Sequence, residues 1–286
     1  GRTGFAHLGI TESGAADKWA MRCANALVGN AESEPLLEIT LGGFAFTSGC
    51  EVSLAVTGAN APLFLNDIPV DQYQTIELHK GDRFEIKPAS EGARLYLAAS
   101  GGFDTERLFG SASTCTREGL GSELSVGDEL TLSKPTITDS VALSVDQIPQ
   151  FKRSIRLGLV KGLQSHLYDW QAFDRFFKTR FEVSPLADRM GCRLIADNPI
   201  KPPVGGIRSE GINLGAVQIP ADGHPIIMLN DHQTIGGYMK IGSICRADLA
   251  LLAQATPGTE VFFYPISVEH AQHRLRHQLK RVPKLV

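Results

Sequence analysis

The densest group of reactive side chains lies in the segment LNDHQTIGGYMK, residues 229–240, which follows an apolar run. It brings a carboxylate, an imidazole, amides, a hydroxyl and an ammonium group around the adjacent glycines Gly236 and Gly237. Adjacent glycines let the backbone approach a ligand closely, and their amides can donate to a carboxylate or phosphate. A solvated hairpin with a Gly-Gly turn uses the same residue types. The density of unlike polar groups favours a functional segment.

A second polar segment, GGIRSEGIN over residues 205–213, places Arg208, Ser209 and Glu210 between glycines. This composition predicts a loop. Arg208 and Glu210 can act together in general-base chemistry, or they can form a surface ion pair, which is the commoner arrangement.

The start of the chain is a third polar segment. Its polar residues are Arg2, His7, Thr11, Glu12, Ser13 and Asp17. Ser13 is a predicted helix N-cap and Asp17 falls in the predicted first turn, so helix chemistry alone explains both. A helix N-terminus also attracts anions, which makes these two residues candidates for substrate binding.

The sequence gives little support for a metal site. His270, His273 and His277 share one face of a predicted helix, but no carboxylate or thiol is known to face them, so a basic exposed helix is favoured and no metal is assigned. The five cysteines are scattered and are expected to be reduced. Phosphate-loop, dinucleotide-binding, nucleophile-elbow and zincin motifs do not occur.

The elements that must position these segments are mostly strands. A helix is predicted over about 14–28, followed by short apolar runs at 44–46, 52–56, 63–65, 83–86 and 94–97 that are typical of a sandwich or barrel. The Pro-, Ser- and Thr-rich stretch 134–150 is the expected boundary between domains over 1–145 and 146–286. The second half predicts a strand at 154–158, short strands between 181 and 227 and a strand at 261–264, with helices at 170–179, 247–254 and 268–281.

Composition limits the class of protein. The chain has 286 residues and a formal net charge of −3, which suits a globular protein and leaves no basic surface for nucleic acid. No apolar run is long enough to span a bilayer and no signal peptide opens the chain. We therefore expect a cytoplasmic protein with neither a nucleic-acid nor a membrane partner.

The opening GRTGFAHLGITESGAAD resembles that of the allophanate hydrolase subunit 2, or KipA-like, family. The resemblance continues through the segments ANALVGN, LEITLG, TGA, DRMG, SEGI, GAVQIP, NDHQTIGGY and DLALLAQ, in this order along the whole chain. It implies a mainly β protein with minor α content, built of two cyclophilin-like β-barrel domains. Family members begin with a strand before the position of Gly1, so the first barrel is expected to lack an edge element.

The resemblance also implies a function. The family includes the C subunit of the ATP-dependent 5-oxoprolinase, a cyclic-amide hydrolase, and the carboxyltransferase domain of biotin-dependent urea carboxylase. We expect the first, inactive alone and working in a heteromeric complex with KipI-like and LamB/YcsF-like subunits. ATP is the expected cofactor, shared with these partners, and 5-oxoproline is the expected substrate.

Opening an unreactive lactam needs an anion clamp, a base and donors to a developing oxyanion. Asp231 is the hypothetical base or substrate-orienting carboxylate, with Gln233 a further catalytic candidate. His7 and Glu210 are expected to orient the site from facing loops. The candidate substrate-binding residues are Thr234, Gly236, Gly237, Tyr238, Ser209, Arg208, Lys240, Arg2, Ser13 and Asp17.

Two alternatives stay open. One is carboxyl transfer from carboxybiotin to urea or a related amide, with biotin as cofactor. The other is a non-catalytic regulator that binds a KipI-like kinase inhibitor.

Overall fold

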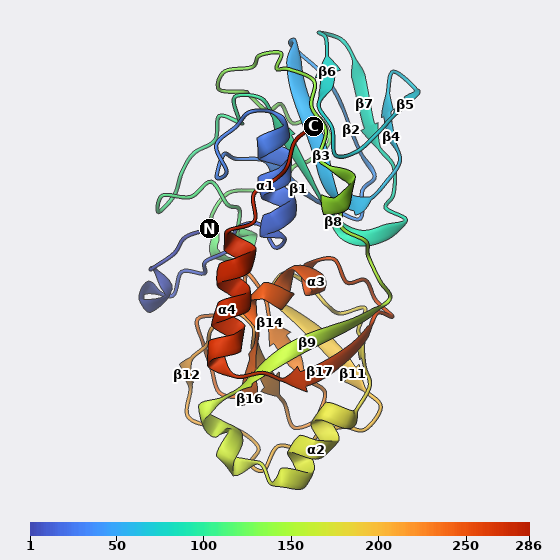
Figure 1. Ribbon diagram of the computed structural model, residues 1–286. Coiled ribbons are helices and arrows are strands. Elements are labelled where there is room, and N and C mark those ends of the chain that lie inside the picture. Colours follow the sequence, from blue (N-terminus) through green and yellow to red (C-terminus); the bar gives the residue numbers. More distant parts are fainter. The chain divides into compact units, whose positions relative to one another are not determined.

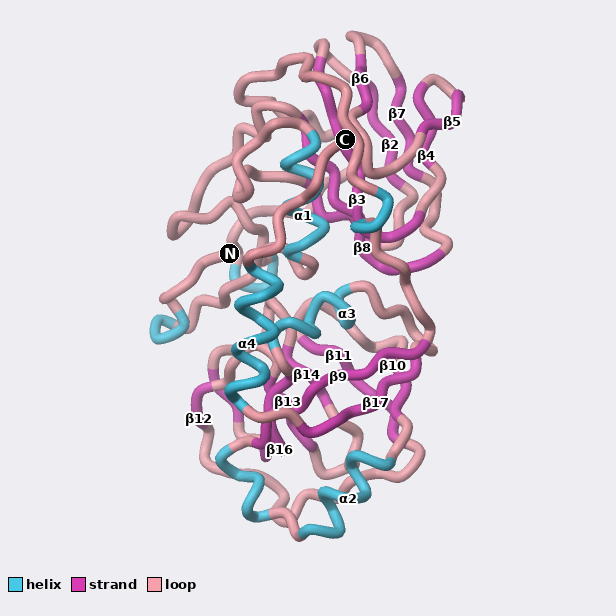
Figure 2. The backbone as a smooth tube through the Cα atoms, viewed as in Figure 1, coloured by secondary structure: helices cyan, strands magenta, loops and turns pink.

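The computed structural model describes residues 1–286 and is mainly β, as predicted (Figures 1 and 2). The residues form two compact units. The C-terminal unit contains Gly1–Ala16, Arg117–Gly119 and Lys152–Arg281, and the N-terminal unit contains Asp17–Thr116, Leu120–Phe151 and Val282–Val286. This division differs from the expected 1–145 and 146–286 chiefly because both chain ends belong to the unit of the opposite half.

The C-terminal unit is a closed barrel with the strand order β10-β11-β14-β13-β16-β9-β17. All its strand pairs are antiparallel except β9 with β17, and closure leaves no free sheet edge. The strands are β9 (Ser154–Lys161), β10 (Phe181–Val183), β11 (Gly191–Ala196), β13 (Ala216–Ile219), β14 (Ile226–Met228), β16 (Met239–Ile244) and β17 (Glu260–Pro265). A separate two-stranded ribbon pairs β12 (Glu210–Gly211) with β15 (Ile235–Gly236).

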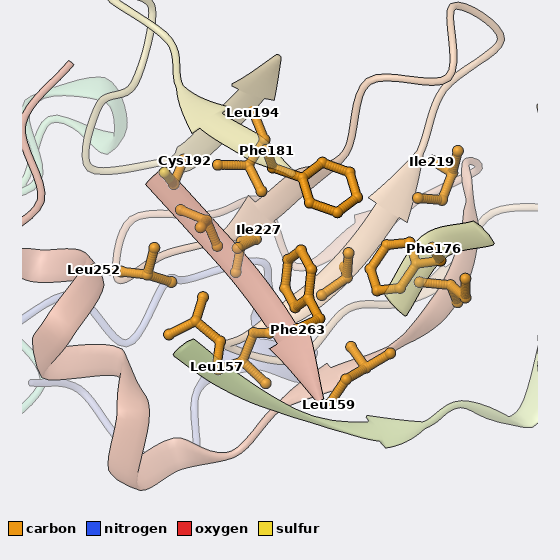
Figure 3. Packing of buried hydrophobic residues seen from close by; sticks show 14 of the residues in the cluster. Leu157, Leu159, Phe176, Phe181, Cys192, Leu194, Ile219, Ile227, Leu252 and Phe263 are labelled. Atoms are coloured by element: carbon orange, nitrogen blue, oxygen red, sulfur yellow. The ribbon is translucent and has the colours of Figure 1, made fainter. Parts of the chain in front are cut away.

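Aromatic and aliphatic side chains fill the barrel (Figure 3). The ring of Phe263 lies 4.6 Å from that of Phe176 and 5.1 Å from that of Phe181, between centroids. Phe176 comes from α2 (Trp170–Lys178), which lies at one end of the barrel in Figure 1. The N-cap of α2 is Asp169, whose side chain accepts from the Ala172 amide. Helix α2, predicted at 170–179, and the barrel strands therefore share one core.

The N-terminal unit has two four-stranded sheets, in the orders β1-β8-β3-β6 and β2-β7-β4-β5. The strands are β1 (Leu37–Thr40), β2 (Phe44–Thr47), β3 (Val52–Asn60), β4 (Leu63–Leu65), β5 (Ile68–Val70), β6 (Ile76–Leu78), β7 (Arg83–Ile86) and β8 (Glu91–Ala99). The predicted short strands are confirmed. They form two sheets around one core, whereas a closed ring of paired strands is found only in the C-terminal unit.

The first helix is shorter than predicted. Helix α1 spans Lys18–Leu27, and Asp17 is its N-cap, accepting from the amides of Trp19 and Ala20 at 3.1 Å each. The prediction that Ser13 caps this helix is wrong, because Ser13 has a left-handed backbone with φ of 53° and lies in the other unit. The sequence contains two residues of a capping type, and Asp17, one turn after Ser13, is the one that caps the helix.

The last helices follow the prediction. α3 spans Leu249–Ala253 and α4 spans Val268–Leu279. All three histidines of α4 are exposed, and no group of three His, Cys, Asp or Glu side chains in residues 1–286 is arranged to hold a metal ion. None of the helices combines the length and apolar character needed to cross a membrane.

Candidate functional site

The end of β14 holds the N-terminal segment of the chain. The Asn230 side-chain amide donates to the carbonyl oxygens of Ser13 at 3.3 Å and Ala15 at 3.2 Å. The Ser13 amide in turn donates to the Asn230 carbonyl at 3.0 Å. These contacts fix the strained backbone at Ser13, a conformation of the kind that collects at functional sites. Asn230 therefore ties residues 13–15 to the polar segment that was singled out from its composition.

Asp231 is engaged in a bidentate ion pair. Its two carboxylate oxygens accept from Arg189 Nε at 2.7 Å and Nη2 at 3.0 Å. Arg189 Nη2 also donates to the Gly14 carbonyl at 2.8 Å. Both side chains are largely covered, 29% exposed for Arg189 and 13% for Asp231. Both oxygens of Asp231 bind the planar guanidinium of Arg189, so this geometry fits a carboxylate that orients Arg189.

A tight turn places Arg189. Asp188 Oδ1 accepts from the amides of Met190 at 2.8 Å and Gly191 at 2.9 Å, just before β11 begins. The Asp231 amide donates to the Arg189 carbonyl at 2.8 Å, which joins this turn to the end of β14. Sequence reasoning missed Arg189 as a site residue. The available signal was its place in the DRMG segment, which includes the acidic turn residue.

A second charged pair lies beside Asp231. Arg117 Nη2 donates to the Asp231 carbonyl at 3.4 Å and to Glu118 at 2.8 Å. The Glu118 carboxylate accepts from both the amide and the hydroxyl of Thr11, at 3.1 Å each. No motif marked residues 117–118, which precede Asp231 by more than a hundred positions. Two guanidinium groups thus lie next to the Asp231 segment, each paired with a carboxylate.

The predicted residues of the first segment are dispersed. Arg2 is buried, 2% exposed, and its amide donates to the Glu12 carbonyl at 2.6 Å. His7 is exposed and its Nδ1 lies 3.1 Å from the Gly4 carbonyl oxygen, a local contact. Asp17 belongs to the N-terminal unit, where it caps α1. The structure therefore joins Ser13 to Asn230 and the Asp231 pair, whereas the contact of His7 is local and Asp17 caps α1.

The β12–β15 ribbon carries the second polar group of the barrel unit. Glu210 Oε1 accepts from Lys240 Nζ and from Gln164 Nε2, the latter at 2.5 Å. Gln164 Oε1 accepts from the Lys240 amide at 2.7 Å. The Lys240 side chain is 14% exposed and that of Glu210 is 48% exposed. The predicted partner of Glu210 was Arg208, but Lys240 and Gln164 bind it instead.

Gln218 lies beneath the ribbon. The residue is 1% exposed, and its Nε2 donates to no acceptor. Burying a polar group in this state costs about 1–3 kcal/mol of folding free energy. Gly236 covers it so closely that a Cβ atom there would lie 3.2 Å from Nε2 and 2.5 Å from Ile212 Cδ1. Sequence reasoning missed Gln218, although it lies in the matched segment GAVQIP.

The other predicted residues line the same loops. Arg208, Ser209 and Tyr238 are exposed, and a Cβ atom at Gly237 would lie 3.0 Å from the Ile207 carbonyl oxygen, a tight contact. The Thr234 carbonyl accepts from the Ile212 amide at 2.9 Å, and the Gln233 carbonyl lies 2.6 Å from His232 Nδ1. Gln233 and Thr234 thus lie on the stretch of chain between the Asp231 pair and the ribbon. Their substrate contacts stay predictions.

Two buried groups of the barrel unit have shifted pKa values. Burial raises the pKa of the Tyr168 phenol to about 12. Burial also raises the pKa of the Cys245 thiol above its usual value, which keeps this cysteine protonated and unreactive. Neither group is a candidate for proton transfer near neutral pH.

Comparison with known proteins identifies related chains. Residues 8–265 match the family described as "Carboxyltransferase domain, subdomain A and B". The 5-oxoprolinase C subunit of Escherichia coli is 34% identical over 275 residues, covering 95% of this chain and 88% of that protein. The protein of the same name from Haemophilus influenzae is 34% identical over 281 residues, with the same coverage. The urea amidolyase of Saccharomyces cerevisiae is 29% identical over 294 residues, covering 95% of this chain and 16% of that protein.

Solved structures agree with the fold. The urea carboxylase of Kluyveromyces lactis superimposes with a TM-score of 0.89 at 28% identity, over 98% of this chain and 27% of that one. Another solved chain gives a TM-score of 0.83 at 33% identity. This chain spans 52% of its length.

Proposed function

This chain belongs to the carboxyltransferase-domain family, and from that membership we propose that it is the C subunit of an ATP-dependent 5-oxoprolinase. The observation that carries the proposal is 34% identity to two proteins of that name, over 95% of this chain and 88% of each relative. The substrate is 5-oxo-L-proline and the product is L-glutamate. The name of these relatives implies a complex of several subunits.

The expected partners are KipI-like and LamB/YcsF-like subunits, which share the binding of ATP. ATP would activate the lactam carbonyl oxygen by phosphorylation. Water would then add to the carbon, the ring C–N bond would break with its electron pair and a proton going to nitrogen, and hydrolysis would release the phosphoryl group as phosphate. This chain contributes the surroundings of Asp231. Arg189 and Arg117 are the proposed N–H donors to an anionic group of the substrate, and Asp231 holds Arg189 in the orientation that its bidentate contact defines.

The remaining site groups come from the segment that follows. Gln233 and Thr234 are the expected donors to the substrate carbonyl or carboxylate, and the amides of Gly236 and Gly237 are backbone donors. A preorganised set of donors stabilises an oxyanion because the groups need not reorient as the charge develops.

The test is formation of glutamate from 5-oxoproline in the presence of ATP. The chain is mixed with both partner proteins from the same source, and omitted in a control. Glutamate formation that requires this chain supports the proposal. If the three proteins assemble but the complete mixture forms no more glutamate than the control, the proposal fails, and a complex with only the KipI-like protein then points to a regulatory role.

A second candidate is carboxyl transfer from carboxybiotin to urea or a related amide. It is favoured by the likeness to urea amidolyase and urea carboxylase, with a TM-score of 0.89 for the latter. The discriminating measurement is carboxylation of urea by a biotinylated carrier domain with and without this chain. Transfer that depends on the chain would favour this candidate over the oxoprolinase.

A further inference from the structure

The outer face of the barrel beneath the β12–β15 ribbon contains a buried side-chain donor that has no acceptor. Gln218 Nε2 is buried under Gly236 and donates to nothing. Nearly all buried polar groups in folded proteins have a partner, so the unpaired Gln218 amide needs an explanation, and one explanation is a ligand group that binds there.

Lys240 adds a cationic donor to the same face. Gln218 on β13 and Lys240 on β16 are register partners, so their side chains project from the same side of the sheet. Their neighbours Ile219 and Met239 belong to the barrel core, which leaves Gln218 and Lys240 on the outer face, beneath the ribbon.

Glu210 occupies this face as an acceptor. It belongs to the ribbon, and a single oxygen, Oε1, accepts from both Lys240 and Gln164. Its side chain is about half exposed, so it can rotate into solvent while the barrel stays closed. The strands β12 and β15 contribute two residues each, so the cover over Gln218 rests on few ladder hydrogen bonds.

We propose that Gln164, Gln218 and Lys240 form a carboxylate subsite, in which the carboxylate of a small ligand replaces that of Glu210. A carboxylate brings two oxygens with about four acceptor positions, which suffices for Lys240 Nζ, Gln164 Nε2 and the idle Gln218 Nε2. Glu210 then competes with the ligand's carboxylate for the same donors. The identification of the ligand as 5-oxoproline rests on the proposed function. The set of donors is argued from the structure alone.

The experiment is a calorimetric titration of the chain, alone and with its partner proteins, with 5-oxoproline and with 2-pyrrolidinone. The second compound is the same lactam without the carboxylate. We expect saturable binding of 5-oxoproline and at least tenfold weaker binding of 2-pyrrolidinone, because a hydrogen bond to a charged group carries a tenfold effect or more.

Gln218→Met is the decisive variant, because it keeps the length of the side chain and removes the donor. The affinity for 5-oxoproline should fall at least tenfold, while the melting temperature stays the same or rises by about 2–4 °C, since the buried unpaired amide is gone. A merely structural glutamine would lose stability instead. Lys178→Met, which removes an exposed lysine on α2, is the control and should bind like the wild type.

Glu210→Gln removes the competing charge and should tighten binding several-fold. The subsite is refuted if Gln218→Met binds 5-oxoproline as the wild type does, if 2-pyrrolidinone binds equally well, or if neither the chain nor its complex binds saturably. The two proposals fail separately. If Gln218→Met turns over 5-oxoproline with an unchanged KM, the subsite is refuted and the oxoprolinase function stands. If 5-oxoproline binding depends on Gln218 but no mixture shows turnover, the oxoprolinase function is refuted and the subsite stands.

Discussion

Asp231 and Arg189 work as one unit at the scale of single residues, because each oxygen of the carboxylate meets a nitrogen of the guanidinium. Asp231→Asn keeps the size of the side chain but removes the charge that holds Arg189. We expect turnover in the reconstituted enzyme to fall on the order of a hundredfold, as for other lost positioning groups, with assembly intact. Steady-state glutamate formation and size-exclusion chromatography measure the two effects.

Asp174→Asn is the matched control for this variant, since Asp174 pairs with Lys178 on the exposed face of α2. It should leave turnover unchanged. Wild-type turnover in Asp231→Asn would remove Asp231 from the mechanism.

Tyr168 belongs to the same scale and predicts a pH effect. Its hydroxyl is buried without a hydrogen-bond partner, and its pKa is raised to about 12 from an ordinary value of 10. The folded state therefore binds the proton more tightly, so the contribution to stability is complete below about pH 10 and is lost as the pH rises towards 12. Tyr168→Phe removes this titration, so between about pH 10 and 12 its unfolding free energy should fall less steeply with pH than that of the wild type, by up to about 1.4 kcal/mol per pH unit.

Urea unfolding of both proteins at about pH 8 and pH 11 checks the sign. At the lower pH the variant should equal or exceed the wild type in stability. Parallel pH profiles for the two proteins would show that the phenol ionises freely in the folded state.

At the scale of elements, one ion pair fastens α4 to the barrel. Asp248 is 1% exposed and accepts from Arg274 Nη2 at 2.5 Å and from the Gly158 amide at 2.8 Å. Arg274→Met leaves this carboxylate buried without its cation, which costs about 3–5 kcal/mol of unfolding free energy. Urea unfolding measures the loss, and Arg276→Met, on the exposed face of the same helix, should cost less than about 0.5 kcal/mol.

A rescue variant makes this prediction specific. Asp248→Asn in the Arg274→Met background removes the stranded charge and should recover part of the stability. Equal stability of the single and double variants would mean that the charge of Asp248 is satisfied by other groups.

The pairing of β16 with β9 depends on a glycine. A Cβ atom at Gly242 would overlap the Val160 carbonyl oxygen, and it would also lie 3.0 Å from Leu159 Cγ. Gly242→Ala must therefore push the two strands apart, and we expect a loss of about 1–3 kcal/mol in unfolding free energy. Gly205→Ala is the control, because no atom lies within 4 Å of its added Cβ. Thermal unfolding that is the same in both variants would contradict the predicted clash.

At the scale of the whole molecule, the chain is expected to act only within an assembly. Under the proposed function, ATP is shared with the partner subunits, and the sequence of this chain has no phosphate-loop motif. We expect 5-oxoproline-dependent phosphate release from the mixture of all three proteins and none from this chain or from any pair. Phosphate release by this chain alone would place the complete nucleotide site within it.

Much of the fold followed from local pattern. Alternating short runs predicted the strands at 52–56 and 83–86, and helical spacing predicted α2 and α4, because burial of one face imposes a period that the sequence displays. Prediction was weaker where two residues competed for one role. Ser13 and Asp17 both qualify as caps by residue type, but Asp17 caps the helix and Ser13 instead bonds to Asn230.

The sequence by itself determined the family, the mainly β architecture and the polar segments at 205–213 and 229–240, since all of these depend on residue types in order along the chain. Only the tertiary structure decided which of these groups meet. Arg189 reaches Asp231 across 42 positions, Arg117 reaches it across 114, and Gln218 is left without a partner by the ribbon that covers it. The physical reason is that a side chain's partners are set by how the closed barrel and its covering loops pack, and spacing along the chain does not encode that convergence.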